Sequence, residues 1–104
     1  MIPLSKLPYS VQLQALTTTY DDVGMPVESW KKAATIRADI QPLGGELAER
    51  QYGIVEVGIT ARMFCNPSTD VQLARRAVYD SMTYEIRHVA AYRGHMEVLL
   101  RPVI

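Results

Sequence analysis

The residues of this chain that could do chemistry are two histidines, one cysteine and a few carboxylates. His88 and His95 form no HxxxH or HxH pair, and no cysteine stands at ligand spacing from either, so we expect no metal site. Cys65 lies in FCNPS, which supplies no base to activate a thiol. A small buried apolar side chain is the more typical role. His88 shares the phase of Tyr84 and Ile86, so it either lies at the core edge or is rotated outward by a bulge.

The carboxylates and the glycine pair do not suggest an active site either. Asp21 and Asp22 are adjacent and would point to opposite sides of an extended segment, which is poor geometry for an acid/base pair. Glu46 and Glu49 could share a helix face, but that spacing is typical of a solvated surface. The Gly44-Gly45 pair is followed by an acidic residue and not by Lys-Ser/Thr, so it is no phosphate loop. We therefore expect no catalytic residues, no cofactor and no enzyme.

The composition predicts one domain that binds no polyanion through a long-range field. The 104 residues carry eleven Lys and Arg against eleven Asp and Glu, so the formal charge is zero. Near-zero charge also favours self-association. A single cysteine forms no internal disulfide, and the opening MIPLSKLPYS resembles neither a signal peptide nor a membrane span. We expect the protein to be made in the cytoplasm and used or assembled there.

The elements that would position these residues read mostly as strands. Residues 1–8 contain Pro3 and Pro8 and predict an extended tail. Residues 11–20 alternate as a strand, and Asp21-Asp22-Val23-Gly24 has turn chemistry. Residues 27–32 form the returning side of that turn. Residues 34–41 alternate as a strand with one apolar face, and Pro42 ends this strand.

Residues 43–53 lose the two-residue period, and we interpret them as a long functional loop with at most about two helical turns. The run 54–65 has the clearest alternation in the chain, and 70–76 could form a short helix capped by Asp70. Further strands are expected at 77–80, 84–92 and 96–100, with a hairpin loop at 93–95. Short strands without strong helices predict a single all-β domain over residues 1–104, a small β-barrel or sandwich with long loops.

Basic and aromatic residues leave two interpretations open. Arginines alternate out of the strands, as solubilising positions normally do. Trp30, the only tryptophan, is expected to be a core or interface anchor. Alternatively, a small nucleic-acid-binding β-barrel would use one basic face, with the arginines Arg62, Arg75, Arg76 and Arg87. Few aromatics are available as a stacking platform for single strands.

The order of these features resembles the small bacteriophage head–tail joining proteins, also called head-closure or stopper proteins. The turn and tryptophan match D-x-x-G-x-P-x-x-x-W, with Asp21, Gly24, Pro26 and Trp30. A strand of the form A-T-I-x-A-x-I-x-P-L-x-G follows from Ala34. R-x-Y-G, a long alternating strand and a Y-x-I strand come next, in the residues Arg50, Tyr52, Gly53, 55–65 and 84–86. The likeness covers about residues 10–101 and departs at 70–77 and in the turn, which reads DDVG and not DEYG.

The resemblance implies a β-barrel that assembles as a ring, a dodecamer or alternatively a hexamer, in the neck of the virion. Its partners would be other copies, a portal or adaptor protein on the head side, and a tail terminator or tail-completion protein on the tail side. Double-stranded DNA would pass through the lumen without sequence-specific binding, and no membrane is involved. A ring that DNA must traverse should not grip phosphates, which a neutral chain avoids. A cellular interaction module is a third alternative.

Two groups of residues are our candidates for these contacts. The first is a lumen or partner loop, formed by Leu43, Gly44, Gly45, Glu46, Glu49, Arg50 and Tyr52. The second is a set of inter-subunit or partner contacts, formed by Arg75, Arg76, Ile2 and Leu4. A loop that orders only on assembly would make docking conditional on the partner.

Overall fold

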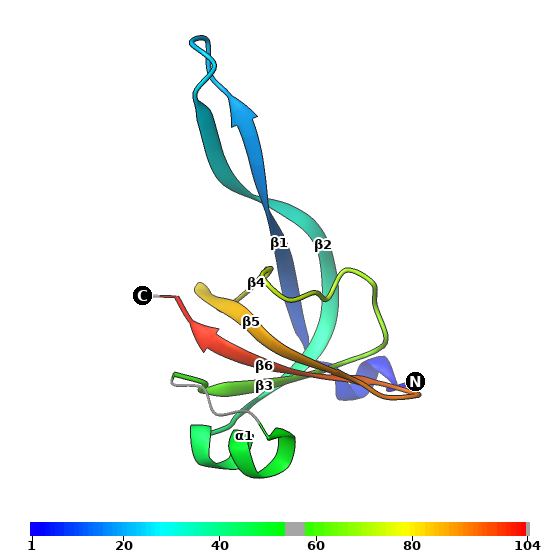
Figure 1. Cartoon of the computed structure of the whole chain (residues 1–104). Helices are drawn as coiled ribbons and strands as arrows, with labels where there is room; N and C mark the ends of the chain where they lie inside the picture. The colour runs from blue at the N-terminus through cyan, green and yellow to red at the C-terminus, as the bar shows by residue number, and fades with distance from the viewer. Residues whose placement is uncertain (54–57, 104) are drawn as a thin grey trace.

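The computed structural model describes residues 1–53 and 58–103, and six antiparallel strands close into a barrel (Figure 1). The strands are β1 (Tyr9–Tyr20), β2 (Pro26–Pro42), β3 (Ala61–Cys65), β4 (Arg76–Tyr79), β5 (Met82–Ala91) and β6 (Met96–Pro102). They neighbour one another in the order β1-β2-β3-β6-β5-β4 around the barrel. A 3-10 turn, η1 (Leu4–Lys6), and one helix, α1 (Gly45–Tyr52), complete the described elements. The predicted all-β barrel is confirmed.

Strands β1 and β2 form the predicted hairpin around the turn at Asp21. The Asp21 carboxylate accepts hydrogen bonds from the backbone amides of Val23 at 3.0 Å and Met25 at 2.8 Å. Gly24 adopts a φ of 82°, where a side chain would be strained. The turn residues therefore do what their types predict.

A β-bulge joins the two segments predicted at 27–32 and 34–41 into one long strand. Leu13 pairs with Ala34 and Gln14 pairs with Lys32, so Ala33 on β2 has no opposite residue. An extra residue on one strand bends it and increases its twist. The bulge thus lies where the hairpin leaves the barrel wall (Figure 1).

The barrel interior is filled by the inward-facing residues of all six strands. Val11 and Leu13 on β1 and Met63 on β3 are fully buried, as are Val98 and Leu100 on β6. Cys65 is also buried, as predicted, and burial raises the pKa of its thiol to about 11. This apolar interior, removed from water, is the main source of stability that the described residues show.

A second, smaller apolar cluster lies under α1, on the outer face of the barrel. Leu99 alternates with Val98 and Leu100, so it faces outward, and it is nonetheless fully buried. Leu43 and Ala48 cover it from the α1 side, and Tyr52 packs against the cluster. The predicted loop at 43–53 is therefore a two-turn helix with a buried face.

The N-terminal residues are attached to the barrel, so the prediction of an extended tail at 1–8 is wrong in part. Leu7 is buried, and the Arg37 guanidinium donates a hydrogen bond to its carbonyl at 3.0 Å. Asn66 bonds both the amide and the carbonyl of Ile2. These side-chain contacts from β2 and from the loop after β3 fix a segment that lacks strand pairing.

The long strand predicted at 54–65 begins only at Ala61, and residues 54–57 lie outside the described part. Gly58 has a φ of 93°, which ends regular strand geometry there. A Cβ at that position would lie 2.9 Å from the Cδ of Arg101, so a larger residue would have to displace the arginine stem. The alternating pattern of 54–65 hides this break, because Gly58 stands at one of its outward positions.

The helix predicted at 70–76 is not formed. Ala74 has a φ of 68°, which no right-handed helix accommodates. The segment is a turn-rich loop in which the Arg75 guanidinium donates to the carbonyl of Asp70 at 2.9 Å. Asp70 therefore receives a loop contact and does not cap a helix.

Candidate partner-binding site

The far part of the β1–β2 hairpin, residues 15–31, projects away from the barrel, and we call it the arm. The other barrel strands stop below it: β4 pairs with β1 only at residues 12–14, and β3 pairs with β2 only at residues 38–42. The arm strands therefore pair only with each other, and Figure 1 shows them rising above the closed barrel. An isolated two-stranded hairpin is marginally stable in water.

The arm concentrates exposed apolar side chains. Of the eleven large hydrophobic residues exposed in the described part, five lie on it: Leu16, Tyr20, Val23, Met25 and Val27. The exposed fraction reaches 81% at Val23 and 72% at Tyr20. Clustered exposed apolar residues mark interaction surfaces more often than single ones do. The arm is therefore the first candidate for a protein contact.

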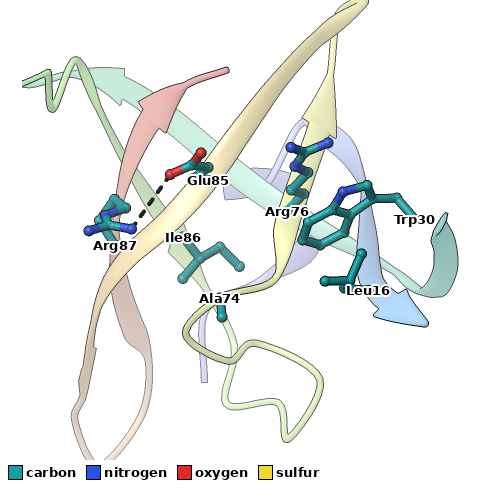
Figure 2. A pocket seen from close by; sticks show the side chains of 7 residues that line it. All are labelled: Leu16, Trp30, Ala74, Arg76, Glu85, Ile86 and Arg87. Atoms are coloured by element: carbon teal, nitrogen blue, oxygen red, sulfur yellow. Dashed lines mark ion pairs between the residues drawn. The ribbon is translucent and has the colours of Figure 1, made fainter. Parts of the chain in front are cut away.

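A groove of about 250 Å³ lies at the base of the arm (Figure 2). Its lining comprises Leu16, Trp30, Ala74, Arg76, Glu85, Ile86 and Arg87. The Arg76 guanidinium lies 4.1 Å from the centre of the Trp30 ring, in cation–π geometry. Glu85 pairs with Arg101 at 2.6 Å and with Arg87 at 3.5 Å. The groove thus combines an apolar floor with a charged rim.

Trp30 is half-buried and belongs to neither apolar cluster of the described residues. Its cross-strand partner is Leu16, which is itself exposed. The structure thus places Trp30 at the junction of arm and barrel, with Arg76 as its cover. Of the two predicted roles, an interface position fits this placement better than a core position.

Besides the small apolar cluster beneath it, helix α1 is held to the barrel by a group of polar side chains. The Tyr52 hydroxyl donates to Oε1 of Glu97 and accepts from Arg62 at 3.2 Å. Arg62 also donates to Gln51 at 2.6 Å, and a ring nitrogen of His95 lies 2.9 Å from the other oxygen of Glu97. We call Tyr52, Arg62, His95 and Glu97 the α1 latch. It joins the helix to β3 and β6.

The latch shifts the acidity of two of its members. Burial would raise the pKa of Glu97, but the hydrogen bonds from Tyr52 and His95, with the nearby Arg62 charge, outweigh it and lower that pKa. Burial raises the pKa of Tyr52, and its bond to Glu97 acts in the same direction against the opposing Arg62. The latch therefore works with an ionised Glu97 and a protonated Tyr52.

Residues of the predicted lumen or partner loop have different environments. Leu43 is buried in the small apolar cluster and Tyr52 is half-buried in the latch, so both side chains pack against the barrel. Gly44 caps the helix start and Gly45 begins it, while Glu49 and Arg50 are exposed. The side chain of Glu46 lies outside the description. Among the described side chains of α1, Leu47 is an exposed apolar one, on the outer face of the helix.

The residues predicted as inter-subunit contacts fall in two places. Arg75 and Arg76 lie beside each other next to the groove, and Arg76 lines it. Ile2 is held by Asn66, whereas Leu4 is 63% exposed on η1. The structure thus brings Arg76 to Trp30, while Arg75 pairs with Asp70. The two N-terminal residues lie elsewhere, Ile2 against Asn66 of the loop after β3 and Leu4 on η1.

The sequence left two positions open for His88, the edge of the core or an outward position produced by a bulge. The register of β5 shifts between Ile86, which is buried, and His88, which pairs with the outward-facing Leu99. The bulge therefore turns His88 outward, and its ring lies 5.8 Å from the Tyr52 ring. No group of three His, Cys, Asp or Glu side chains that could hold a metal ion occurs within residues 1–53 and 58–103.

The family of the chain follows from comparison with known proteins. The family model described as phage head completion protein matches residues 2–100. The chain belongs to this family. Membership gives it a structural role in the head–tail region of a phage, as a component of the virion. The predicted likeness to head–tail joining proteins is confirmed.

A solved structure with the same fold comes from a bacterium. The solution structure of protein SF1141 from Shigella flexneri 2a superposes with a TM-score of 0.75 at 19% identity, covering 97% of this chain and 96% of the other. At this identity the likeness shows the fold alone. A comparison with curated protein sequences gave no match. No helix among the described residues has the length and apolar character needed to span a bilayer.

Proposed function

We propose that this head completion protein forms a ring below the portal or its adaptor, closes the DNA channel after packaging and docks the tail. The observation that carries the proposal is the arm, with its five exposed apolar side chains. A hairpin of this kind is stabilised when a neighbouring protein covers it. Within a virion neck, every copy has such neighbours above, below and beside it.

The charge of the chain supports a role next to DNA without binding it. Eleven basic residues balance eleven acidic ones, so no sustained positive field attracts the phosphate backbone. Each phosphate neutralised by a protein adds affinity that would hold back moving DNA. A neutral barrel suits a channel wall.

The outer face of α1 is our candidate for the lumen or for contact with the portal or tail protein. Leu47 is 43% exposed there, and Glu49 and Arg50 are further exposed residues of the same helix. The helix is short and rests on the barrel through a small apolar cluster and the α1 latch. A segment attached by so few contacts is a good candidate for one that rearranges on assembly.

Truncation of the arm tests the proposal. Thr17 pairs directly with Ser29, so residues 18–28 can be replaced by Asn-Gly, the preferred two-residue hairpin turn. The barrel should stay folded, because the arm pairs only with itself. We expect electron microscopy to show heads that lose DNA or lack tails and neck density. Normal tailed particles with full heads would refute the proposed role of the arm.

A separate test addresses α1. Deleting residues 45–52 would expose Leu99 and Ile59, so a folding defect would confuse the result. Leu47→Ser combined with Glu49→Lys changes only exposed positions and should leave the melting temperature unchanged. We expect particles that leak DNA or fail to join tails, with Met82→Ser as a control at another exposed apolar position. Normal particles would remove α1 from the function.

The nucleic-acid-binding alternative is less well supported by the side-chain contacts. Arg62 contacts Glu97 and Tyr52, Arg75 contacts Asp70, and Arg76 covers Trp30. Arg87 lies 3.5 Å from Glu85. The four arginines therefore have partners within the chain. Binding of short DNA that weakens steeply with salt would revive this alternative, and no binding at low salt would exclude it.

A further inference from the structure

We infer that the tip of the arm, residues 20–28, inserts into the groove at the base of the arm on a second copy of this chain. The inference rests on the proposed ring and specifies the contact that would build it. Each copy would then offer one tip and one groove, which are different surfaces. Such a heterologous contact repeats from copy to copy and closes into a ring when the rotation between neighbours allows it.

The tip has the shape and chemistry of an inserted element. Val23 is 81% exposed and Met25 is 59% exposed, at the turn itself. Their backbone amides donate to the Asp21 carboxylate, so the turn has local hydrogen bonds that favour its conformation before a partner binds. A pre-ordered apolar tip loses little conformational entropy when it binds.

The groove has the size and lining to receive such a tip. Its volume of about 250 Å³ corresponds to roughly eight water molecules at about 30 Å³ each, which one or two side chains could displace. Leu16 and Trp30 form one wall, and Ile86 lies at the bottom. Displacing water from an apolar surface by an apolar side chain is favourable.

Charge distinguishes this occupant from an arbitrary apolar segment. Residues 20–28 contain three acidic residues, Asp21, Asp22 and Glu28, and no basic one. The groove is lined by Arg76 and Arg87 against the single Glu85, which also pairs with Arg101. The neutral chain thus has an acidic tip and a basic groove, and two copies are complementary where they meet.

The contact must form between copies. Leu16 lines the groove and Tyr20 ends β1, so the tip starts four residues, about 13 Å at 3.3 Å per residue, beyond its own groove. A disulfide requires Cα atoms within about 7 Å. Cysteines at Val23 and Ala74 could therefore link only the tip of one copy to the groove of another.

Cross-linking in assembled heads tests the inference. Val23 and Ala74 are both exposed, so Val23→Cys and Ala74→Cys should not affect folding. The native Cys65 can stay, because it is 1% exposed. We expect heads assembled with the double variant to give, after oxidation, a ladder of covalent multimers on a gel without reductant. Each single variant should give monomers, as should Val23→Cys combined with Arg93→Cys on the far β5–β6 hairpin.

The outcomes separate the inference from the proposed function. If neck density is present but the gel shows only monomers, the tip-in-groove contact is overturned while the proposed ring stands. Dimers from Val23→Cys alone would also overturn this contact, because they indicate that two tips meet. Absent neck density would count against the proposed function. An oxidised mixture of the two single variants in solution then decides the contact, since a heterodimer supports it and its absence overturns it.

Discussion

The hydroxyl of Tyr52, at the last residue of α1, donates a hydrogen bond to the carboxylate of Glu97 on β6. Forty-five residues separate the two in sequence. This contact, with Arg62 beside it, fastens a two-turn helix that would be marginal on its own. The attachment of α1 therefore depends on polar groups as much as on the small apolar cluster beneath it.

Tyr52→Phe should loosen α1 while the barrel stays folded. The substitution keeps the ring but leaves the half-buried Glu97 without one donor, which typically costs about 1–2 kcal/mol in unfolding free energy. Urea denaturation would measure this loss. Tyr20→Phe, at a position that is 72% exposed, serves as the matched control and should change nothing. Equal stabilities of the two variants would show that the hydroxyl contributes nothing.

The lowered pKa of Glu97 predicts acid sensitivity. A carboxyl whose pKa is lower in the folded state stabilises the protein above its unfolded pKa, about 4.3, and this stabilisation disappears as pH falls through the folded value. Between pH 6 and pH 3, wild type should therefore lose more stability than Glu97→Gln. Denaturation of both proteins across this range measures the difference. Parallel pH profiles would contradict the prediction.

The sequence predicts the barrel because inward positions recur every second residue. Val11 and Leu13, like Ala34 to Ile40, follow this period and pack as expected. The second apolar cluster was missed, although Leu99 interrupts the alternation of its strand with an apolar outward residue. That interruption was the available signal for a covering element, which α1 provides.

The candidate site was harder to predict because it depends on distant pairings. Arg62 and Glu97 meet only because β3 and β6 pair in one particular register. The arm projects because β3 and β4 are short, which the turn chemistry of Asp21 cannot indicate. Trp30 stands out in the sequence as the only tryptophan, yet its cover by Arg76 arises from pairing between β1 and β4. Sequence patterns therefore predict where the strands lie. The lengths of the strands and the registers of their pairing determine which side chains meet on the surface.

Leu99→Ala should free α1 selectively. The side chain is fully buried between β6 and the helix, so its removal leaves a cavity that costs about 2–5 kcal/mol. The loss falls on the contact with α1, so limited proteolysis should cut near residues 45–52 at protease levels that spare wild type. Leu100→Ala, inside the barrel, is the comparison and should destabilise the whole domain without selective cleavage. Identical cleavage patterns would contradict the assignment of Leu99 to α1.

Trp30→Ala should lower the unfolding free energy only modestly, although it removes the largest side chain of the protein. The side chain is only partly buried, so apolar burial contributes less than the about 1.5–3 kcal/mol of full burial, or about 1–2 kcal/mol. The cation–π contact with Arg76 adds about 0.5–1 kcal/mol. The sum, about 1.5–3 kcal/mol, reaches at most the lower end of the 3–5 kcal/mol typical of a fully buried tryptophan. Denaturant unfolding measures it, with Leu13→Ala as the core comparison. A loss as large as that of Leu13→Ala would show that Trp30 anchors the barrel and not the base of the arm.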